Sequence, residues 1–111
     1  MKRWNGWGSD RIEAHLPPIA QKYLAEILGP SQPGPSARFE DIVRRIPKSR
    51  LSDHPLIGSD PGFRLRHTRG HSLPDWIALR FGTVDSFPDA VAQPTSEKDV
   101  EKLIEFARET S

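Results

Sequence analysis

The chain has 111 residues, 35% of them hydrophobic and 28% charged, a length that fits one small domain or part of a larger one. Sixteen Lys and Arg residues nearly balance fifteen Asp and Glu residues, so no strong field attracts nucleic acid and we expect no nucleic-acid partner. Cysteine is absent, which excludes disulfides, zinc–thiolate sites and a Cys nucleophile.

The first ten residues are aromatic and rich in glycine. Trp4 and Trp7 flank the turn pair Asn5-Gly6, and we expect both rings to pack back on the domain or on a further part of the protein. Basic residues precede them, but no apolar segment follows as in a secretory signal. No run of apolar residues approaches the ~20 that a membrane span needs, so we expect no membrane span and a cytoplasmic protein.

A helix is predicted over residues 17–28, because proline suits a first helical turn and Gly29-Pro30 is a stop signal. Its apolar side chains recur every four residues in two adjacent rows and make a broad stripe: Ile19, Tyr23, Ile27, Ala20, Leu24 and Leu28. The Pro, Gly and Ser residues at 29–36 predict a loop.

A second, short helix is predicted over residues 37–46. Its apolar face consists of Phe39, Ile42, Val43 and Ile46. Acidic residues in the first turn and arginines near the last suit the helix dipole, and Pro47 ends the helix. Residues 48–62 contain several Pro and Gly residues and predict a folded loop anchored by apolar side chains.

The next segment, residues 63–71, alternates loosely between apolar and polar side chains and predicts a short strand or an extended arm. A helix is then predicted up to the stop at Gly82. Ser72 is its expected N-cap, and Asp75 lies three residues later as in a capping box.

The last stretch has the most regular pattern. Residues 90–93 predict a short apolar strand, and Ser96 is the expected N-cap of a helix with Asp99 at its third position. A strand followed by such a helix usually returns to a second, neighbouring strand, which this sequence does not contain. We therefore expect an incomplete βα unit, with an exposed edge on the 90–93 strand.

His67 and His71 are spaced four apart, which on a helix could place both on one metal ion. Gly70 interrupts a helix here, and no HExxH motif is present. We therefore expect no metal site. The absence of a GxSxG motif also leaves no nucleophile, so we expect no catalytic residue in this chain.

Arginines surround the same histidines. Arg66, Arg69 and His71 could hold a phosphate or carboxylate, with the helix N-terminus at Ser72 adding backbone donors. Alternatively, these residues tie an extended arm to another part of a larger enzyme through hydrogen bonds.

Three segments, taken in order, resemble one family. They are RWNGWG at residues 3–8, RHTRGHSLPD at residues 66–75, and FPDAVAQPTSEKDV at residues 87–100. The first two are similar to segments of alkyldihydroxyacetone-phosphate synthase (alkylglycerone-phosphate synthase) and its bacterial flavoprotein relatives. The third resembles the start of the FAD-binding domain of the vanillyl-alcohol-oxidase class of oxidoreductases.

The pattern of elements predicts a mainly α fold with one or two short strands. The resemblance implies that residues 1–82 form a helical N-terminal module with irregular loops, and that residues 83–111 begin an FAD-binding domain. It implies FAD in the complete enzyme, with Pro94 and Thr95 as the matching cofactor positions. The family's Gly-rich pyrophosphate loop and its substrate cap domain have no counterpart in this sequence, so we expect no FAD on this chain alone.

Two functions fit these observations. In the first, the chain is an N-terminal fragment of an FAD-dependent oxidoreductase that supports the flavin domain, with a small-molecule substrate only in the complete enzyme. In the second, it is a stand-alone helical interaction module, or a subunit that pairs with a separately encoded flavin domain. An engineered domain, a truncated reading frame and one half of a split protein all agree with the sequence.

Overall fold

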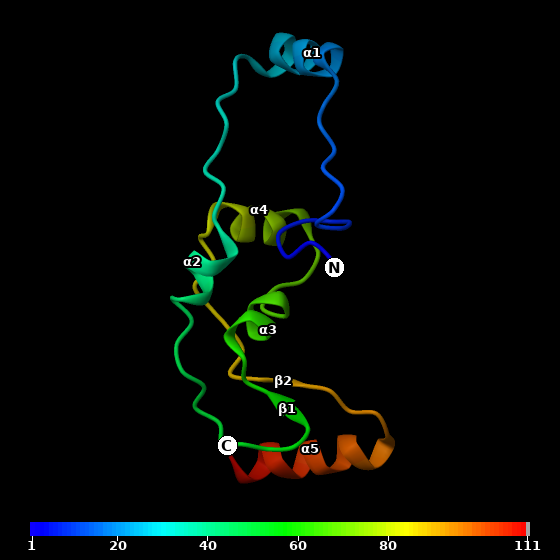
Figure 1. Cartoon of the computed structure of the whole chain (residues 1–111), viewed down its shortest axis with the longest axis vertical. Helices are drawn as coiled ribbons and strands as arrows, with labels where there is room; N and C mark the ends of the chain where they lie inside the picture. Colours follow the sequence, from blue (N-terminus) through cyan, green and yellow to red (C-terminus); the bar gives the residue numbers. More distant parts are fainter. Residues whose placement is uncertain (111) are drawn as a thin grey trace.

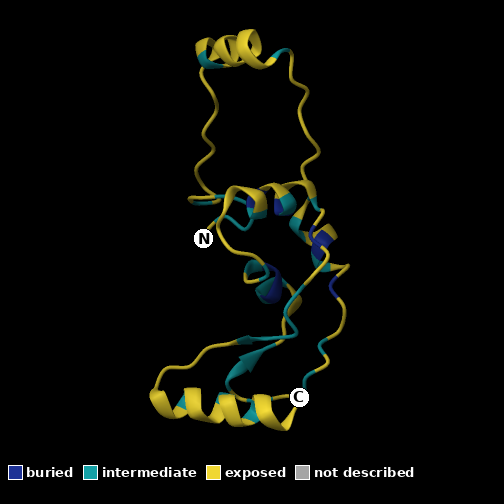
Figure 2. Cartoon of the chain, turned by 180° about the vertical axis from the view of Figure 1, so that it is seen from behind, coloured by how far each residue is buried: buried dark blue, intermediate teal, exposed yellow. Residues whose placement is uncertain are grey.

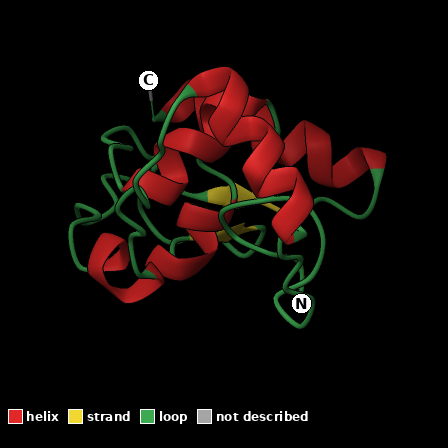
Figure 3. Ribbon diagram, turned by 90° about the horizontal axis from the view of Figure 1, so that it is seen from above, coloured by secondary structure: helices red, strands yellow, loops and turns green. Residues whose placement is uncertain are grey.

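The computed structural model describes residues 1–110 and contains five helices and two short strands in that range (Figures 1 and 3). The elements are α1 (Pro18–Leu28), α2 (Phe39–Val43), β1 (Ile57–Gly58), α3 (Pro61–Arg66), α4 (Leu73–Phe81), β2 (Val91–Ala92) and α5 (Glu97–Glu109). The expected class, mainly α with one or two short strands, is confirmed. No helix in the described part of the chain is long and apolar enough to cross a membrane.

The chain is elongated. It measures 57 × 28 × 23 Å, and its radius of gyration is 18.5 Å, whereas a compact chain of this length has about 13 Å. Figure 1 shows α1 at one end, carried on two arms without regular structure, and α5 at the other end. The buried residues lie between them, as the colouring of Figure 2 shows.

A small hydrophobic core joins α2, α3 and α4. Its buried members are Ile42, Ile46, Leu65, Trp76, Leu79 and Val84. The apolar face predicted for residues 37–46 is therefore confirmed, although regular helix covers only Phe39–Val43. The N–H of Ile46 donates to the carbonyl of Val43, three residues earlier, whereas an α-helix would use the carbonyl four residues earlier. The last turn before Pro47 is therefore tighter than an α-helical turn.

Arg64 is the one buried charged residue among those described, with 2% of its surface exposed. Its Nε donates to the carbonyl oxygen of Pro88 at 2.6 Å, and its Nη1 donates to that of Pro47 at 2.8 Å. A buried guanidinium needs such partners, because an unpaired one would lose its hydration without compensation. Arg64 thus fastens two distant loops to α3.

The predicted strand or arm at residues 63–71 is wrong, because the chain forms α3 there. Asp60 is the N-cap: its carboxylate accepts the N–H of Phe63 at 2.9 Å, and Pro61 occupies the first turn. Arg64 and Leu65 are consecutive and both buried, which the alternating face of a strand would not allow.

The loop predicted at residues 48–62 contains β1, which the sequence analysis missed. Ile57 pairs with Ala92 and Gly58 with Val91, in antiparallel register. The predicted strand at 90–93 is confirmed as β2, but its partner precedes it in the chain. The sequence analysis did not anticipate this partner, which covers one edge of β2.

Both predicted helix caps are confirmed. Ser72 and Asp75 form a complete capping box at the start of α4, and Gly82 ends that helix in the left-handed conformation, with φ of 70°. Ser96 accepts the N–H of Asp99 at the start of α5. The division of the chain at residue 82 stays a prediction.

Candidate functional site

A pocket forms where the N-terminal segment folds over α3 and α4. Residues 1–10 make a hairpin-like turn, in which Arg3 donates its N–H to the carbonyl of Gly8 at 3.0 Å and Asp10 donates to that of Met1 at 3.2 Å. Gly8 has a φ of 89°, which a residue with a side chain rarely adopts. This turn covers one side of the pocket.

The pocket has a volume of about 730 Å³, within the range of small-molecule sites. Its lining combines basic and aromatic side chains: Lys2, Arg3, Arg66, His67, Arg69, His71, Trp4, Trp7 and Trp76. No Asp or Glu lines it. We refer to it as the basic aromatic pocket.

The three residues proposed from sequence as an anion or interdomain site all lie at this pocket. Arg66 donates from Nη1 to the carbonyl of Lys2 at 3.0 Å, and its guanidinium lies 5.0 Å from the ring centre of Phe39. Arg69 forms a long ion pair of 3.9 Å with Asp85, which is exposed. The roles of Arg66, Arg69 and His71 stay predictions, but the fold brings the three together.

Two tryptophans and His71 form the aromatic wall. The imidazole of His71 stacks on Trp76 at 5.1 Å between ring centres, and Trp7 meets Trp76 edge to face at 6.1 Å. Trp76 is 9% exposed, yet its Nε1 has no hydrogen-bond partner. The packing predicted for Trp4 is confirmed by its edge contact with Phe39 at 5.5 Å, whereas Trp7 remains 64% exposed.

Asp75 lies next to this wall without lining the pocket. Its carboxylate accepts the hydroxyl of Ser72 at 2.6 Å and the backbone N–H of Ser72 at 3.2 Å. These two bonds, and to a smaller degree the charges of Arg69 and His71, hold the pKa of Asp75 below its usual value. Asp75 thus stabilises α4 and balances part of the positive charge.

His67 is not placed to share a metal with His71. Its Nδ1 lies 2.8 Å from the carbonyl oxygen of Phe63, and its ring packs on the ring of Phe63 at 4.5 Å. Among residues 1–110, no three His, Asp or Glu side chains gather as metal ligands would.

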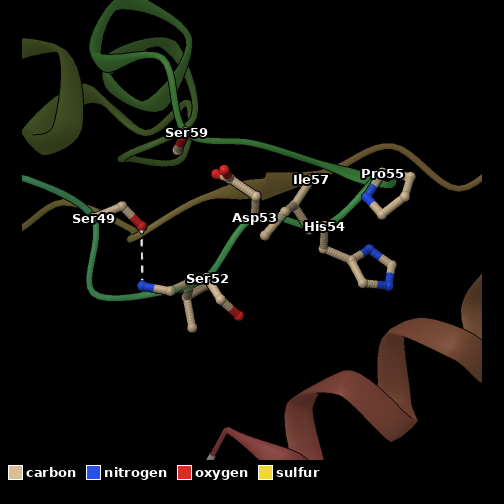
Figure 4. A pocket seen from close by; sticks show the side chains of 8 residues that line it. Ser49, Ser52, Asp53, His54, Pro55, Ile57 and Ser59 are labelled. Carbon is tan, nitrogen blue, oxygen red and sulfur yellow. Dashed lines mark hydrogen bonds between the residues drawn. The ribbon is translucent and has the colours of Figure 1, made fainter.

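A second, smaller pocket of about 400 Å³ lies beside β1 and contains serine, aspartate and histidine residues (Figure 4). They do not form a catalytic triad. Figure 4 shows the imidazole of His54 turned away from the carboxylate of Asp53. Nδ1 of His54 instead accepts the N–H of Leu56 at 3.2 Å, and the ring packs on Phe106 of α5 at 4.6 Å. This histidine connects β1 to α5.

Both end helices expose their apolar faces. Neither α1 nor α5 contains a buried residue. The exposed apolar side chains on and just before α1 are Ile12, Leu16, Ile19, Tyr23, Leu24, Ile27 and Leu28, and on α5 they are Val100 and Ile104. A contiguous apolar surface of this kind usually marks a contact with another part of a protein or a partner.

Comparison with known proteins gives a consistent result. No family model matches the chain. Over 95% of its length it is 26% identical to the alkyldihydroxyacetonephosphate synthase of Caenorhabditis elegans, and over 66% it is 34% identical to that of Dictyostelium discoideum. Two crystal structures of alkyldihydroxyacetonephosphate synthase match 97% of the chain, with TM-scores of 0.70 and 0.65 and identities of 24% and 25%. The homologues of this chain are alkyldihydroxyacetonephosphate synthases.

The chain spans about a quarter of the synthases it matches most fully. It covers 22% of the worm synthase, and 25% and 26% of the chains in the two crystal structures. The resemblance to this family that three segments of the sequence indicated is therefore confirmed. The fold of the chain matches that of the corresponding part of the synthase.

The synthase family depends on FAD, so the predicted cofactor positions can be compared with the geometry. Pro94 has no N–H to donate. The N–H and the hydroxyl of Thr95 both donate to the carboxylate of Asp99 at 3.0 Å, and these bonds lower the pKa of Asp99. A negatively charged acceptor already holds both donors of Thr95, so this turn does not fit a pyrophosphate. The contact of Pro94 and Thr95 with FAD stays a prediction.

Proposed function

We propose that this chain is the supporting N-terminal segment of an FAD-dependent enzyme of the alkyldihydroxyacetonephosphate synthase type, and that it is not catalytic alone. The observation that carries this proposal is its match to 97% of the chain within a synthase about four times as long. The match includes the elongated shape, which a free chain would not favour, because it leaves two apolar helix faces in water.

The part of the chain that would support a flavin domain is residues 86–93, here termed the lead-in segment. It runs from the helical module to β2 and overlaps the sequence that resembles the start of the flavin domain. Residues 50–68 hold it at almost every position. The hydroxyl of Thr68 donates to the carbonyl of Ser86, and the guanidinium of Arg64 donates to the carbonyl of Pro88. Arg50 donates to the carboxylate of Asp89, and the N–H of Gln93 donates to the carbonyl of Leu56. The pairing of β1 with β2 adds to these bonds.

This arrangement explains how the chain would act. The buried guanidinium of Arg64 fixes the backbone just before β2, and the antiparallel pair fixes the direction in which β2 continues. A flavin domain that begins at β2 would therefore start from a defined position. The remainder of that domain, in the same chain or in another, is the proposed partner, and the chemistry belongs to the flavin.

The first test is a titration of the chain with FAD, followed through flavin fluorescence. We expect no saturable binding, because both donors of Thr95, at the position that matches the family's cofactor contact, are held by the carboxylate of Asp99. Saturable binding at micromolar FAD would overturn the proposal.

The second test is a chimera in which residues 1–111 replace the matching segment of the Dictyostelium synthase. We expect the purified chimera to contain FAD, and we expect Arg64→Met to lower the FAD content because the lead-in segment loses its fixed position. Arg108→Gln, on the exposed surface of α5, is the matched control and should leave the FAD content unchanged. Equal FAD content in all three proteins would contradict the supporting role of Arg64.

The exposed apolar face of α1 favours a second candidate, a stand-alone interaction module or a subunit that pairs with a separate flavin domain. Sedimentation of the free chain discriminates between the two. A stable monomer together with an undisturbed α1 favours an independent module, whereas association or loss of α1 favours a segment that needs its partner.

A further inference from the structure

The supporting role of the chain uses the lead-in segment and leaves the basic aromatic pocket without a function. That pocket forms where the N-terminal turn closes over residues of α3 and α4, and no residue of the lead-in segment lines it. Its features indicate a ligand that the supporting role does not require.

The pocket contains positive charge that the chain neutralises only in part. No acidic side chain lines it, and Lys2 forms no ion pair with any residue of the described range 1–110. Arg69 has only the ion pair of 3.9 Å with the exposed Asp85, and the carboxylate of Asp75 is occupied by Ser72. Four Lys and Arg side chains line this one cavity, and Arg and Lys are the usual partners of phosphate, a group that carries up to two negative charges.

Two buried donors on the lining residues also lack acceptors. They are Nε of Arg3 and Nε1 of Trp76. A buried N–H without a partner costs about 1–3 kcal/mol, so two on residues of the same pocket are unusual in a folded chain.

The aromatic wall adds a second requirement. Trp76 is only 9% exposed, so the rings that face a ligand are those of His71, which is exposed and stacks on Trp76, and of Trp7, which is 64% exposed. Such a surface favours a planar, weakly polar group beside the anion. An inorganic ion alone would leave this wall unused.

We propose that the basic aromatic pocket binds a small phosphate monoester that carries a planar body. The phosphate lies among Lys2, Arg66 and Arg69, and the planar group lies against the exposed rings of Trp7 and His71. This binding site is separate from the lead-in segment and does not depend on the supporting role.

The test uses phenyl phosphate as the probe and the chain's own fluorescence as the signal. All three tryptophans of the chain line this pocket, so a bound ligand changes most of the emission. At about pH 8 the probe is a dianion, since its second pKa is near 6. We expect a saturable change with a dissociation constant in the millimolar range or tighter, and a weaker affinity as salt is added.

Variants and control ligands decide where and how the probe binds. Lys2→Gln combined with Arg69→Gln removes two exposed charges and should weaken binding about tenfold or more, since charge-assisted contacts are the strong ones. Arg108→Gln on α5 should have no effect. Inorganic phosphate should bind more weakly than phenyl phosphate, and phenol should show no saturable binding.

The proposal is overturned if phenyl phosphate gives no saturable signal, if the double variant binds it as well as Arg108→Gln does, or if phenol binds equally. Far-UV circular dichroism of the double variant verifies that the fold is unchanged. If the chain binds FAD and the double variant binds it equally well, FAD does not use this pocket. That result would contradict the supporting role and would leave the proposal for the pocket standing.

Discussion

The centre of the molecule and its two ends differ in how much apolar surface the chain itself covers. Around α2, α3 and α4 the chain buries six apolar side chains and one arginine. The end helices α1 and α5 bury none, and both are almost wholly exposed in Figure 2. Yet helices of both regions begin with similar local signals: proline in the first turn of α1, α3 and α4, and a side-chain cap at α3, α4 and α5.

This difference shows that the local signals that start and end a helix are distinct from the packing that stabilises it in the folded chain. Isolated helices of 11 or 13 residues are marginal in water, because the first turn is costly and each later residue adds little. The end helices therefore depend on a surface that covers their apolar faces, and the supporting role proposed above supplies one. The central helices do not need it.

The largest expected effect comes from truncating one isoleucine in each region. Ile42→Ala, at a position only 1% exposed, should lower the free energy of unfolding by about 3 kcal/mol, because it removes buried methyl groups and leaves a cavity. Ile104→Ala on α5, at 48% exposed, should change it by less than about 0.5 kcal/mol. Urea unfolding followed by tryptophan fluorescence measures both.

If Ile42→Ala and Ile104→Ala lowered the free energy of unfolding by the same amount, the distinction between centre and ends would not hold. Such equal losses would mean that α5 packs on the core in solution more closely than the ring contact of Phe106 with His54 indicates.

A smaller effect is expected from two glycines that each follow a helix with positive φ. Gly82→Ala should destabilise the chain by about 2 kcal/mol, because its φ is 70° and the new Cβ would lie 2.9 Å from the Cβ of Ala37. Gly29→Ala has a φ of 82° but open space around it, so the strain should only loosen the end of α1.

Hydrogen exchange of backbone amides distinguishes these outcomes. Gly82→Ala should raise exchange across α2 and α4, whereas Gly29→Ala should raise it in α1 alone. A global loss of stability in Gly29→Ala would show that α1 is coupled to the core after all.

The sequence predicts the features of this fold that depend on local signals better than those that depend on tertiary contacts. The capping signals of Ser72 and Ser96 correctly predict α4 and α5, because such signals act within one turn. The strand at Ile57–Gly58 is not predictable in this way, because a strand of two residues has no periodicity to detect. The helix at Pro61–Arg66 does carry a local signal, Asp60 before Pro61, but the loose alternation of residues 63–71 indicated an extended segment instead.

The candidate site shows the same limit. Arg66, Arg69 and His71 are close in sequence, so their grouping can be predicted. Lys2 and Trp76 join them only because the N-terminal turn folds back over α4, which is a tertiary contact. The two tryptophans beside Asn5-Gly6 are the one local sign that this turn packs on something.

The smallest expected effect concerns acid, at the boundary between centre and end. Arg50 donates to the carboxylate of Asp89 through its side chain and its backbone N–H, with Nη2 at 2.6 Å, and these bonds lower the pKa of Asp89 to about 2. The unfolded chain, with a pKa near 3.8, takes up this proton first as the pH falls. The contribution of Asp89 to stability is therefore complete above about pH 4 and is lost between about pH 4 and 2.

Asp89→Asn removes this acid-sensitive contribution and should flatten the loss of stability between about pH 4 and 2 compared with the unchanged chain. Arg50 is 86% exposed, so water and salt weaken the pair and the effect should be small. Asp85→Asn, at an exposed position with only a long ion pair, is the matched control and should keep the original acid response.

Since Asp89 lies in the lead-in segment, the hydrogen exchange of β2 should rise over the same pH range in which the acid lowers the stability of the chain. If β2 stays protected while Asp89 is protonated, then Arg64 and the β1–β2 pair hold the segment without the ion pair.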